Sequence, residues 1–500
     1  MGIVRTTVHN DDKKNAIKHD REYDRRQGRV MTQKRVYDLG ALDWTVCGYT
    51  PHAWRLGRGL ETGGMLCPEV PPVPAAVPGS VQGALRRAGV IPDWNLGLNA
   101  RACEWVENRH WIFETAVPRE WLGTPGARVR LHCDGLDFAG TLHVNGRRVL
   151  SFATSHVPHV VDLTSRLPEE GDLRLHIVFE LPPRWLGQFG DTSRMTDWKP
   201  RFNYGWDWTA RVVQQGIWDS IRLEVVSGCE LRDLCASTGL GADGGRMRVR
   251  AGATGPEAAS VRVRLLDGDR MVRETRVPAA EFNANGIDWE DLAVDPWWPH
   301  TLGEQPLYDL EVCLLNGAGD RLDTQKRRLG FCRIEWEANE AAPADADPWI
   351  CVVNGRRLFL FGVNWTPIRP VFADVTEDDY RRRLAVYRAM GVRLLRVWGG
   401  AFLEKEIFYR LCDEMGFLVW QEFPLSSSGC ENYPPDAPDS MEALAEIARS
   451  YLARRAHHTS LAVWCGGNEL RATKEDNQVP VTLEHPLIKR FADIVAEMDP

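Results

Sequence analysis

The sequence lacks any apolar run that approaches the ~18 residues needed by a membrane-spanning helix. It also lacks an excess of positive charge, since the formal net charge is −8 at pH 7 and the pI is near 6.0. The totals therefore imply no basic face of the kind that nucleic acid or an acidic membrane surface requires. We expect neither nucleic acid nor a membrane as a partner.

The first thirty residues lack the apolar core of a secretion signal, because charged residues are dense throughout them. The chain as written is therefore expected to be cytoplasmic. Met31 stands just before the patterned part of the sequence and is a second candidate for the true start. In that case Met1 to Val30 would be a disordered or miscalled extension, and signal-peptide reasoning about Met1 would be void.

The twelve cysteines show neither CxxC nor Cys/His metal-ligand spacing. Cys133, Cys412 and Cys465 lie inside apolar runs where a small hydrophobic residue would serve equally well. We expect reduced, buried thiols, and nothing in the sequence calls for a metal or a cofactor.

Tryptophan, by contrast, is abundant, with 20 residues. An indole face can stack on the apolar face of a pyranose ring while its N–H stays free to donate, so tryptophans in loops suit carbohydrate. Most tryptophans in proteins belong to the core, and we expect only a minority of these near a ligand. Those beside Gly, Pro, Asn or Asp in predicted loops include Trp94, Trp206, Trp208, Trp297, Trp298 and Trp398.

The length of the chain predicts about two to four domains, and two β-rich regions come first. From Leu42 to Val226, short alternating strands such as Arg128–Cys133 surround a hairpin signal at Asn145-Gly146. Strands without intervening helices favour a β-sandwich. A second strand-rich stretch from Leu231 to Glu335 suits an immunoglobulin-like sandwich of about 100 residues.

After Val352 strands alternate with helices, which predicts parallel strands joined by right-handed crossovers. The predicted strands are Leu358–Asn364, Arg393–Gly400, Phe417–Glu422 and Leu461–Cys465, and the predicted helices are Glu377–Met390, Glu404–Met415, Ser440–His457 and Leu487–Met498. Polar or aromatic residues fall at each strand end, as a barrel active site requires: Asn364, Trp365, Arg396, Trp398, Glu422, Asn468 and Glu469.

The last of these strands ends at Gly466-Gly467 and then presents Asn468 and Glu469. An exposed carboxylate at a barrel strand end can act as an acid or base. The alternative, that Glu469 caps a helix or is an ordinary loop carboxylate, stays open on these residues alone.

Several stretches in order along the chain resemble the β-mannosidases of glycoside hydrolase family two. They are Val77–Val81, Glu104–Glu107, Phe202–Trp208, Gly216–Trp218 and Trp297–Tyr308. The resemblance implies a jelly-roll sugar-binding β-sandwich, an immunoglobulin-like β-sandwich and a (β/α)8 TIM barrel of which about four βα units are present. The predicted limits are 1–30 for the extension, 31–228, 229–338 and 339–500 for the three domains.

In that family the Gly-Trp-Asp-Trp loop reaches from the jelly roll into the barrel. The resemblance implies that Glu469 is the acid/base, that Asn468 holds the sugar 2-hydroxyl, and that Asp207, Trp206 and Trp398 line the pocket. On the residues alone, the loop could instead be an aromatic corner with Asp207 capping a turn. Thr209-Ala210 replace the Gly-Pro that follows the family's motif, which leaves the path of the loop open.

The family's nucleophile is a Glu on the seventh barrel strand, and no residue of this sequence corresponds to it. We therefore expect the chain to be the N-terminal part of a longer protein or a truncated gene product. Glu422 is expected to orient a neighbour by hydrogen bonding, and Arg396 to act as a fixed charge near Glu469.

The implied function is that of a retaining exo-β-mannosidase acting on terminal β-D-mannose of an oligosaccharide substrate. Alternatives are another family-two exo-glycosidase, acting on β-glucuronides, β-galactosides or β-glucosamine, or a non-catalytic carbohydrate-binding fragment. The oligomeric state is also open, and a homodimer is one alternative for it.

Overall fold

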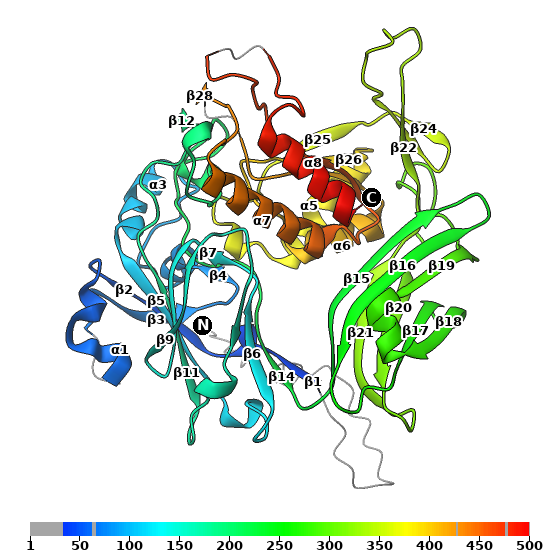
Figure 1. Cartoon of the computed structure of the whole chain (residues 1–500). Coiled ribbons are helices and arrows are strands. Elements are labelled where there is room, and N and C mark those ends of the chain that lie inside the picture. The colour runs from blue at the N-terminus through cyan, green and yellow to red at the C-terminus, as the bar shows by residue number, and fades with distance from the viewer. Residues whose placement is uncertain (1–33, 63–66, 427–428, 476–478, 500) are drawn as a thin grey trace, which may run out of the picture.

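The computed structural model describes residues 34–62, 67–426, 429–475 and 479–499. Two β-rich blocks stand on either side of a helix-covered parallel sheet, with the blue and cyan strands of the first block opposite the green strands of the second (Figure 1). The predicted extension over residues 1–30 lies outside the described residues, as do both candidate start methionines.

The first block is a β-sandwich whose two main sheets have the strand orders β1-β14-β6-β10 and β3-β2-β5-β11-β8-β9. One core joins the sheets, with Phe113 from one and Leu131 and Leu223 from the other. The predicted hairpin is confirmed: Asn145 and Gly146 have φ of 47° and 78° between β8 and β9. The strands and helices of this block are β1 (Lys34–Asp38), β2 (Trp44–Tyr49), α1 (Gly59–Thr62), β3 (Val70–Ala75), β4 (Gly79–Ser80), α2 (Val81–Arg87), α3 (Asn99–Ala102), β5 (His110–Val117), β6 (Arg128–Cys133), β7 (Leu136–Asp137), β8 (Ala139–Val144), β9 (Arg147–Ala153), β10 (His159–Asp162), β11 (Leu173–Phe179), β12 (Gly190–Asp191), β13 (Gly216–Ile217) and β14 (Ile221–Val226).

The second block is also a sandwich, with sheets β15-β16-β19 and β18-β17-β20-β21 around a separate core. It is tied to the last block by Trp297, which is fully buried and donates its indole N–H to the Asp413 carbonyl at 2.8 Å. Its elements are β15 (Glu230–Leu240), β16 (Gly245–Thr254), β17 (Ser260–Asp267), β18 (Arg270–Pro278), α4 (Ala279–Asn285), β19 (Ile287–Leu292), β20 (Tyr308–Leu315) and β21 (Arg321–Leu329).

A small antiparallel sheet follows, formed by β22 (Ile334–Glu337), β23 (Ile350–Val353) and β24 (Arg356–Leu358). The prediction of one continuous strand from Leu358 to Asn364 is wrong. Leu358 pairs with Cys351 in this hairpin, and the chain then turns, with the Phe361 N–H donating to the Phe359 carbonyl. Phe359 is 80% exposed, so the apolar run does not mark a single buried strand.

The last block is a parallel sheet in chain order, β25 (Gly362–Trp365), β26 (Leu394–Val397), β27 (Leu418–Glu422) and β29 (Leu461–Cys465). Its helices are α5 (Glu377–Ala389), α6 (Glu406–Met415), α7 (Pro438–Arg455) and α8 (Pro486–Met498), close to the predicted limits. Helix α5 begins with a capping box in which Thr376 and Asp379 satisfy each other's backbone N–H groups. Within the described residues β25 and β29 are the edges of the sheet, and every residue of β29 is only half-buried.

The first and last blocks are joined at the carboxyl ends of the parallel strands. The short strand β12 of the first sandwich pairs with β28 (Gly429–Glu431), which follows β27, and the two lie side by side in Figure 1. In addition, Phe202 and Trp218 of the first block pack with Phe372, Trp398 and Phe402 of the last. The edge formed by the carboxyl ends of the parallel strands, called the rim below, is therefore held by contacts between residues remote in sequence.

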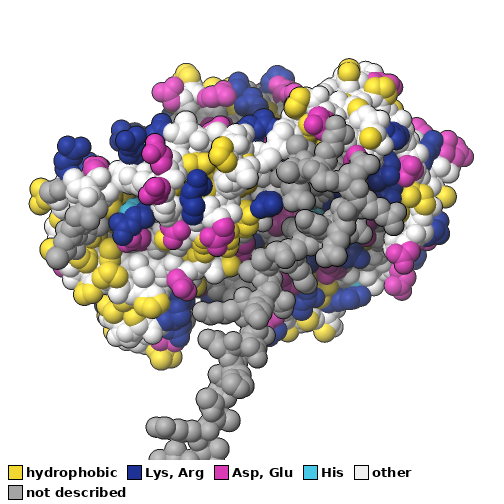
Figure 2. Space-filling model, turned by 90° about the horizontal axis from the view of Figure 1, so that it is seen from below, with side chains coloured by type: hydrophobic (Ala, Val, Ile, Leu, Met, Phe, Trp, Pro, Cys, Tyr) yellow, Lys and Arg dark blue, Asp and Glu magenta, His cyan; other side chains and the backbone are white. Residues whose placement is uncertain are grey.

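Acidic and basic side chains lie interspersed on the described part of the face seen in Figure 2. No helix among the described residues is long and apolar enough to cross a membrane. Cys133 and Cys412 are free and buried as predicted, and Cys465 is free and half-buried, whereas the free cysteines Cys67 and Cys235 are exposed.

Candidate active site

Arg396 joins the carboxyl ends of all four strands in the described part of the parallel sheet. From β26, its Nε donates to Glu422 Oε1 on β27 at 2.7 Å. Its Nη1 donates to Asn364 Oδ1 on β25 at 3.0 Å. Its Nη2 donates to Asn468 Oδ1, just after β29, at 2.7 Å. One guanidinium thus fixes the polar side chains of the rim in a single charge-assisted network.

Glu422 is 1% exposed and has both carboxylate oxygens engaged. Oε1 accepts from Arg396, and Oε2 accepts the Gly399 backbone N–H at 2.7 Å. Burial raises the pKa of Glu422, against the Arg396 charge and the Gly399 hydrogen bond, and the Glu469 charge raises it further. Glu422 therefore holds Arg396 in place, as predicted for a residue that orients a neighbour.

Glu469 lies at the rim with an exposed side chain and an unusual backbone conformation. Its φ is +52°, in the left-handed region that non-glycine residues adopt at a cost. The Asn432 side chain supports this conformation, because its Nδ2 donates to the carbonyls of Asn468 at 3.0 Å and of Glu469 at 2.6 Å. The Asn468 N–H in turn donates to the Leu425 carbonyl at 2.9 Å. No helix begins at Glu469 in the described ranges, so the helix-cap alternative is wrong.

The first sandwich supports Asn432 from the other side. Thr192, just after β12, donates its hydroxyl to Asn432 Oδ1 at 2.9 Å. Arg201 contacts the Ser426 carbonyl at 3.3 Å, on the segment that leads from β27 toward Asn432. The backbone of Glu469 is thus held by a chain of hydrogen bonds that crosses between two blocks.

The aromatic loop of the first sandwich reaches the end of β26. The rings of Trp206 and Trp398 meet edge to face with centroids 4.8 Å apart, and Trp208 approaches Trp398 at 6.2 Å. Trp208 is also stacked on Phe202 at 5.6 Å. Trp398 is only 7% exposed, so its indole is the buried member of this aromatic group.

Asp207 lies at the exposed tip of this loop. Trp206 and Thr209 exchange backbone hydrogen bonds at 3.2 and 3.4 Å, which makes Asp207-Trp208 the centre of a tight turn. The turn closes through the Thr209 backbone without the family's Gly-Pro. The Asp207 carboxylate accepts no hydrogen bond from any described residue, so a turn-capping role for it is not observed.

The structure therefore brings Trp206 to Trp398 and Arg396 to Asn468. The side chains of Asp207 and Glu469 make no hydrogen bond with any of these four residues.

Two domain families match this chain. One, described as glycosyl hydrolase 2 galactose-binding domain-like, matches residues 67–219, and the other, described as glycosyl hydrolases family 2, TIM barrel domain, matches residues 349–483. Together they span more than half of the chain. The chain belongs to glycoside hydrolase family 2. The predicted resemblance and fold class are thereby confirmed.

Family 2 relatives include beta-mannosidase B of Thermothelomyces thermophilus, 32% identical over 411 residues, covering 78% of this chain and 47% of the relative. Beta-mannosidase B of Emericella nidulans is 28% identical over 440 residues, covering 84% and 51%. The chain spans about half the length of these curated relatives.

Among solved structures, a beta-D-mannosidase from Dictyoglomus thermophilum has a TM-score of 0.74 at 25% identity, covering 93% of this chain and 56% of that one. An exo-chitosanase from Amycolatopsis orientalis has a TM-score of 0.66 at 16% identity, covering 93% and 52%, which is a likeness of fold.

Two groups of possible metal ligands exist among the described residues, and neither contains a residue of the candidate active site. In the first, His52, His110 and Glu180 place ligand atoms within 4.8 Å of one another. Trp54 donates to His110 Nδ1 at 3.0 Å, and Arg55 pairs with Glu180 at 2.6 Å. His110 Nδ1 and one carboxylate oxygen of Glu180 are therefore already engaged by other side chains.

In the second group, Glu406 and His457 lie beside His458. His458 Nδ1 is 2.6 Å from Asp413 and its Nε2 is 3.1 Å from Glu406. Burial lowers the pKa of His458, but the Asp413 and Glu406 carboxylates outweigh it and raise the pKa to about 9. A protonated imidazole has no lone pair for a metal, so this group is an ion-pair network.

Proposed function

We propose that this chain carries the sugar-binding and acid/base part of a retaining exo-β-mannosidase, which removes terminal β-D-mannose from the non-reducing ends of oligosaccharides. The observation that carries the proposal is the Arg396 network, which fixes Asn468 beside an exposed Glu469 at the carboxyl ends of the barrel strands. Membership of family 2 and the names of the relatives support the reaction and the sugar.

In this proposal Glu469 protonates the leaving oxygen and then deprotonates the attacking water. Its solvent-facing position suits both steps, because the attacking water must reach the same carboxylate that protonated the leaving oxygen, and the proton lost in the first step is regained from that water in the second. Asn468, with its carbonyl oxygen held by Arg396, directs its amide N–H groups toward the sugar 2-hydroxyl.

Trp206 and Trp398 would provide the apolar wall for the non-reducing sugar, and their edge-to-face contact keeps that wall rigid. The unpaired carboxylate of Asp207, at the tip of the adjoining turn, is available to accept hydrogen bonds from two sugar hydroxyls.

Retention also requires a second carboxylate about 5 Å from the first, to attack the anomeric carbon. Glu422 is unsuited to that task, since Arg396 and Gly399 already occupy both of its oxygens. We therefore assign the attack to a carboxylate other than Glu422.

The test uses a form of the protein that includes the attacking carboxylate. It compares phenol release from aryl β-D-mannoside, β-D-glucuronide, β-D-galactoside and β-D-glucosaminide, with calorimetric binding of mannose measured in parallel. Fastest release from the mannoside supports the proposal. Faster release from another glycoside would overturn the sugar assignment, and binding without release would favour a non-catalytic carbohydrate-binding role. The same comparison is made with the variant Glu469→Gln. Its matched control is Glu257→Gln, an exposed change in the second sandwich.

A further inference from the structure

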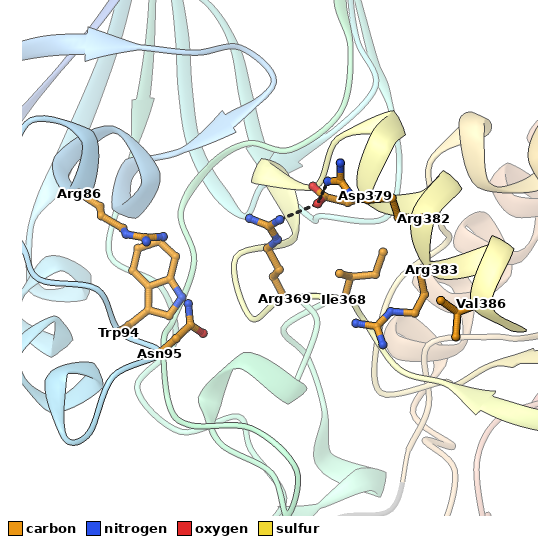
Figure 3. A pocket seen from close by; sticks show the side chains of 9 residues that line it. All are labelled: Arg86, Trp94, Asn95, Ile368, Arg369, Asp379, Arg382, Arg383 and Val386. Atoms are coloured by element: carbon orange, nitrogen blue, oxygen red, sulfur yellow. Dashed lines mark hydrogen bonds and ion pairs between the residues drawn. The ribbon is translucent and has the colours of Figure 1, made fainter.

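A cavity of about 440 Å³ lies between the first sandwich and the barrel block. Figure 3 shows Arg86 and Trp94 on the sandwich side facing Arg369, Arg382 and Arg383 on the barrel side. None of the candidate active-site residues lines this cavity, so it is a separate feature of the molecule.

Most of its lining charge is positive. Arg86 pairs with Asp93 at 2.6 Å and lies over the Trp94 ring, with its guanidinium carbon 5.0 Å from the ring centroid. Arg383 forms no hydrogen bond or ion pair with any residue in the described ranges. Its guanidinium therefore keeps all of its N–H donors free.

The one carboxylate in the lining, Asp379, is already saturated. Its Oδ1 accepts from Arg369 at 2.7 Å and from Arg382 at 3.0 Å. Its Oδ2 accepts the Thr376 N–H at 3.0 Å and the Thr376 hydroxyl at 2.9 Å in the capping box of α5. The cavity thus offers N–H donors and very little acceptor capacity.

The Trp94 indole N–H is a further donor at this site. It donates to no described residue, and in Figure 3 the pyrrole edge of the ring is turned toward the cavity beside Asn95. Donors from two blocks, a free guanidinium and an excess of positive charge thus converge on one space. Like charges gathered in this way repel one another unless an anion lies between them.

We propose that this cavity binds the oxyanion of a small ligand, a carboxylate, sulfate or phosphate group, with Arg383 and Trp94 as its direct contacts. The volume suits a ligand of sugar size. The planar guanidinium of Arg383 can make two parallel hydrogen bonds to such a group. The oxyanion could belong to an acidic sugar unit or be a free inorganic anion, and this inference stands independently of the proposed hydrolase activity.

The test is calorimetric titration of the full chain with sulfate, phosphate and D-glucuronate at constant ionic strength, with D-glucose as the neutral probe. We expect saturable binding of the anions and none of glucose. Arg383→Gln keeps the length of the side chain and removes its charge, and it should weaken anion binding about tenfold. Arg381→Ala is the matched control, because Arg381 precedes Arg383 on α5 by two residues, pairs with Glu377 at 2.8 Å and does not line the cavity.

Tighter binding of glucuronate than of either inorganic anion would support an acidic sugar as the ligand, and equal binding would support a free anion. The proposal is overturned if no anion binds saturably at millimolar concentration or if glucose binds as well as glucuronate. It is also overturned if Arg381→Ala weakens binding as much as Arg383→Gln. Circular dichroism of both variants separates a loss of charge from a loss of fold.

Discussion

Replacing Arg396 by methionine should destabilise the protein more than any ordinary surface change, because it leaves Glu422 buried without its cation. Glu422 has 0% side-chain exposure, whereas the Arg396 side chain is 27% exposed. Breaking a buried pair by removing one partner typically costs about 3–5 kcal/mol. Since Arg396 is partly solvated, we expect the lower end, about 3 kcal/mol. Asn364 is exposed and can bond to water, so its lost hydrogen bond adds little.

The loss should depend on pH in a defined direction. Burial already raises the pKa of Glu422, and the Arg396 charge that opposes this rise is absent from the variant. A carboxyl with a raised folded-state pKa favours the folded state when it is protonated. That contribution is present below the unfolded pKa, about 4.3, and is lost as pH rises through the folded value. The variant should therefore be closer to wild type at pH 5 than at pH 8.

The free energy of unfolding is measured from urea transitions at both pH values, with the m-value checked for constancy. Arg388→Met, an exposed change on α5, is the control and should stay within about 0.5 kcal/mol of wild type. Adding Glu422→Gln to Arg396→Met should recover most of the loss, because the uncompensated charge is then gone. A loss below about 1 kcal/mol, or a double variant as unstable as the single one, would refute the reasoning.

Three further predictions concern local supports. Thr376→Ala should lower the free energy of unfolding by about 1 kcal/mol through loss of the capping box, while Thr376→Ser stays near wild type in the same urea assay. Burial lowers the pKa of His458, but the Asp413 carboxylate helps raise that pKa to about 9. The protonated imidazole therefore stabilises the folded state fully below about pH 6.5, and this contribution is lost as pH rises through about 9. Urea titrations across that range should show the decline in wild type, and its persistence in His458→Gln would contradict the assignment. Asn432→Ala should cost about 1–2 kcal/mol and loosen the backbone at Glu469, seen as faster amide hydrogen exchange there; unchanged exchange would contradict the supporting role.

Local rules in the sequence were sufficient for most of the elements. The strand Leu461–Cys465 and the turn at Asn145-Gly146 are confirmed because alternation, apolar runs and turn residues act over short distances. The start of α5 after Thr376 is confirmed for the same reason, since its cap lies within three residues.

The failure at Leu358–Asn364 has a different cause. An apolar run does not reveal which of its residues face solvent, and pairing of Leu358 with Cys351 in a hairpin competes with the barrel strand. Exposed Phe359 interrupts the run without any turn residue to mark the break. The domain limits at 228/229 and 338/339 stay predictions.

The site was predictable only in part. The strand-end positions of Arg396 and Asn468 follow from the alternation of strands and helices in the sequence. Their hydrogen bond depends instead on how neighbouring strands pack together. The contact of Trp206 with Trp398 was implied by the family resemblance alone. The link from Thr192 to Asn432 was missed, because it joins residues 240 positions apart in two different blocks and has no local signal.

The measurement that tests the central claim most directly is the leaving-group dependence of Glu469→Gln. In a form of the protein that turns over aryl β-D-mannosides, this variant should lose hydrolysis of substrates with poor leaving groups and largely retain the first step on strongly activated ones, which need no proton. Glu257→Gln should behave as wild type on both. An equal rate for Glu469→Gln and wild type on poor-leaving-group substrates would contradict the acid/base role of Glu469.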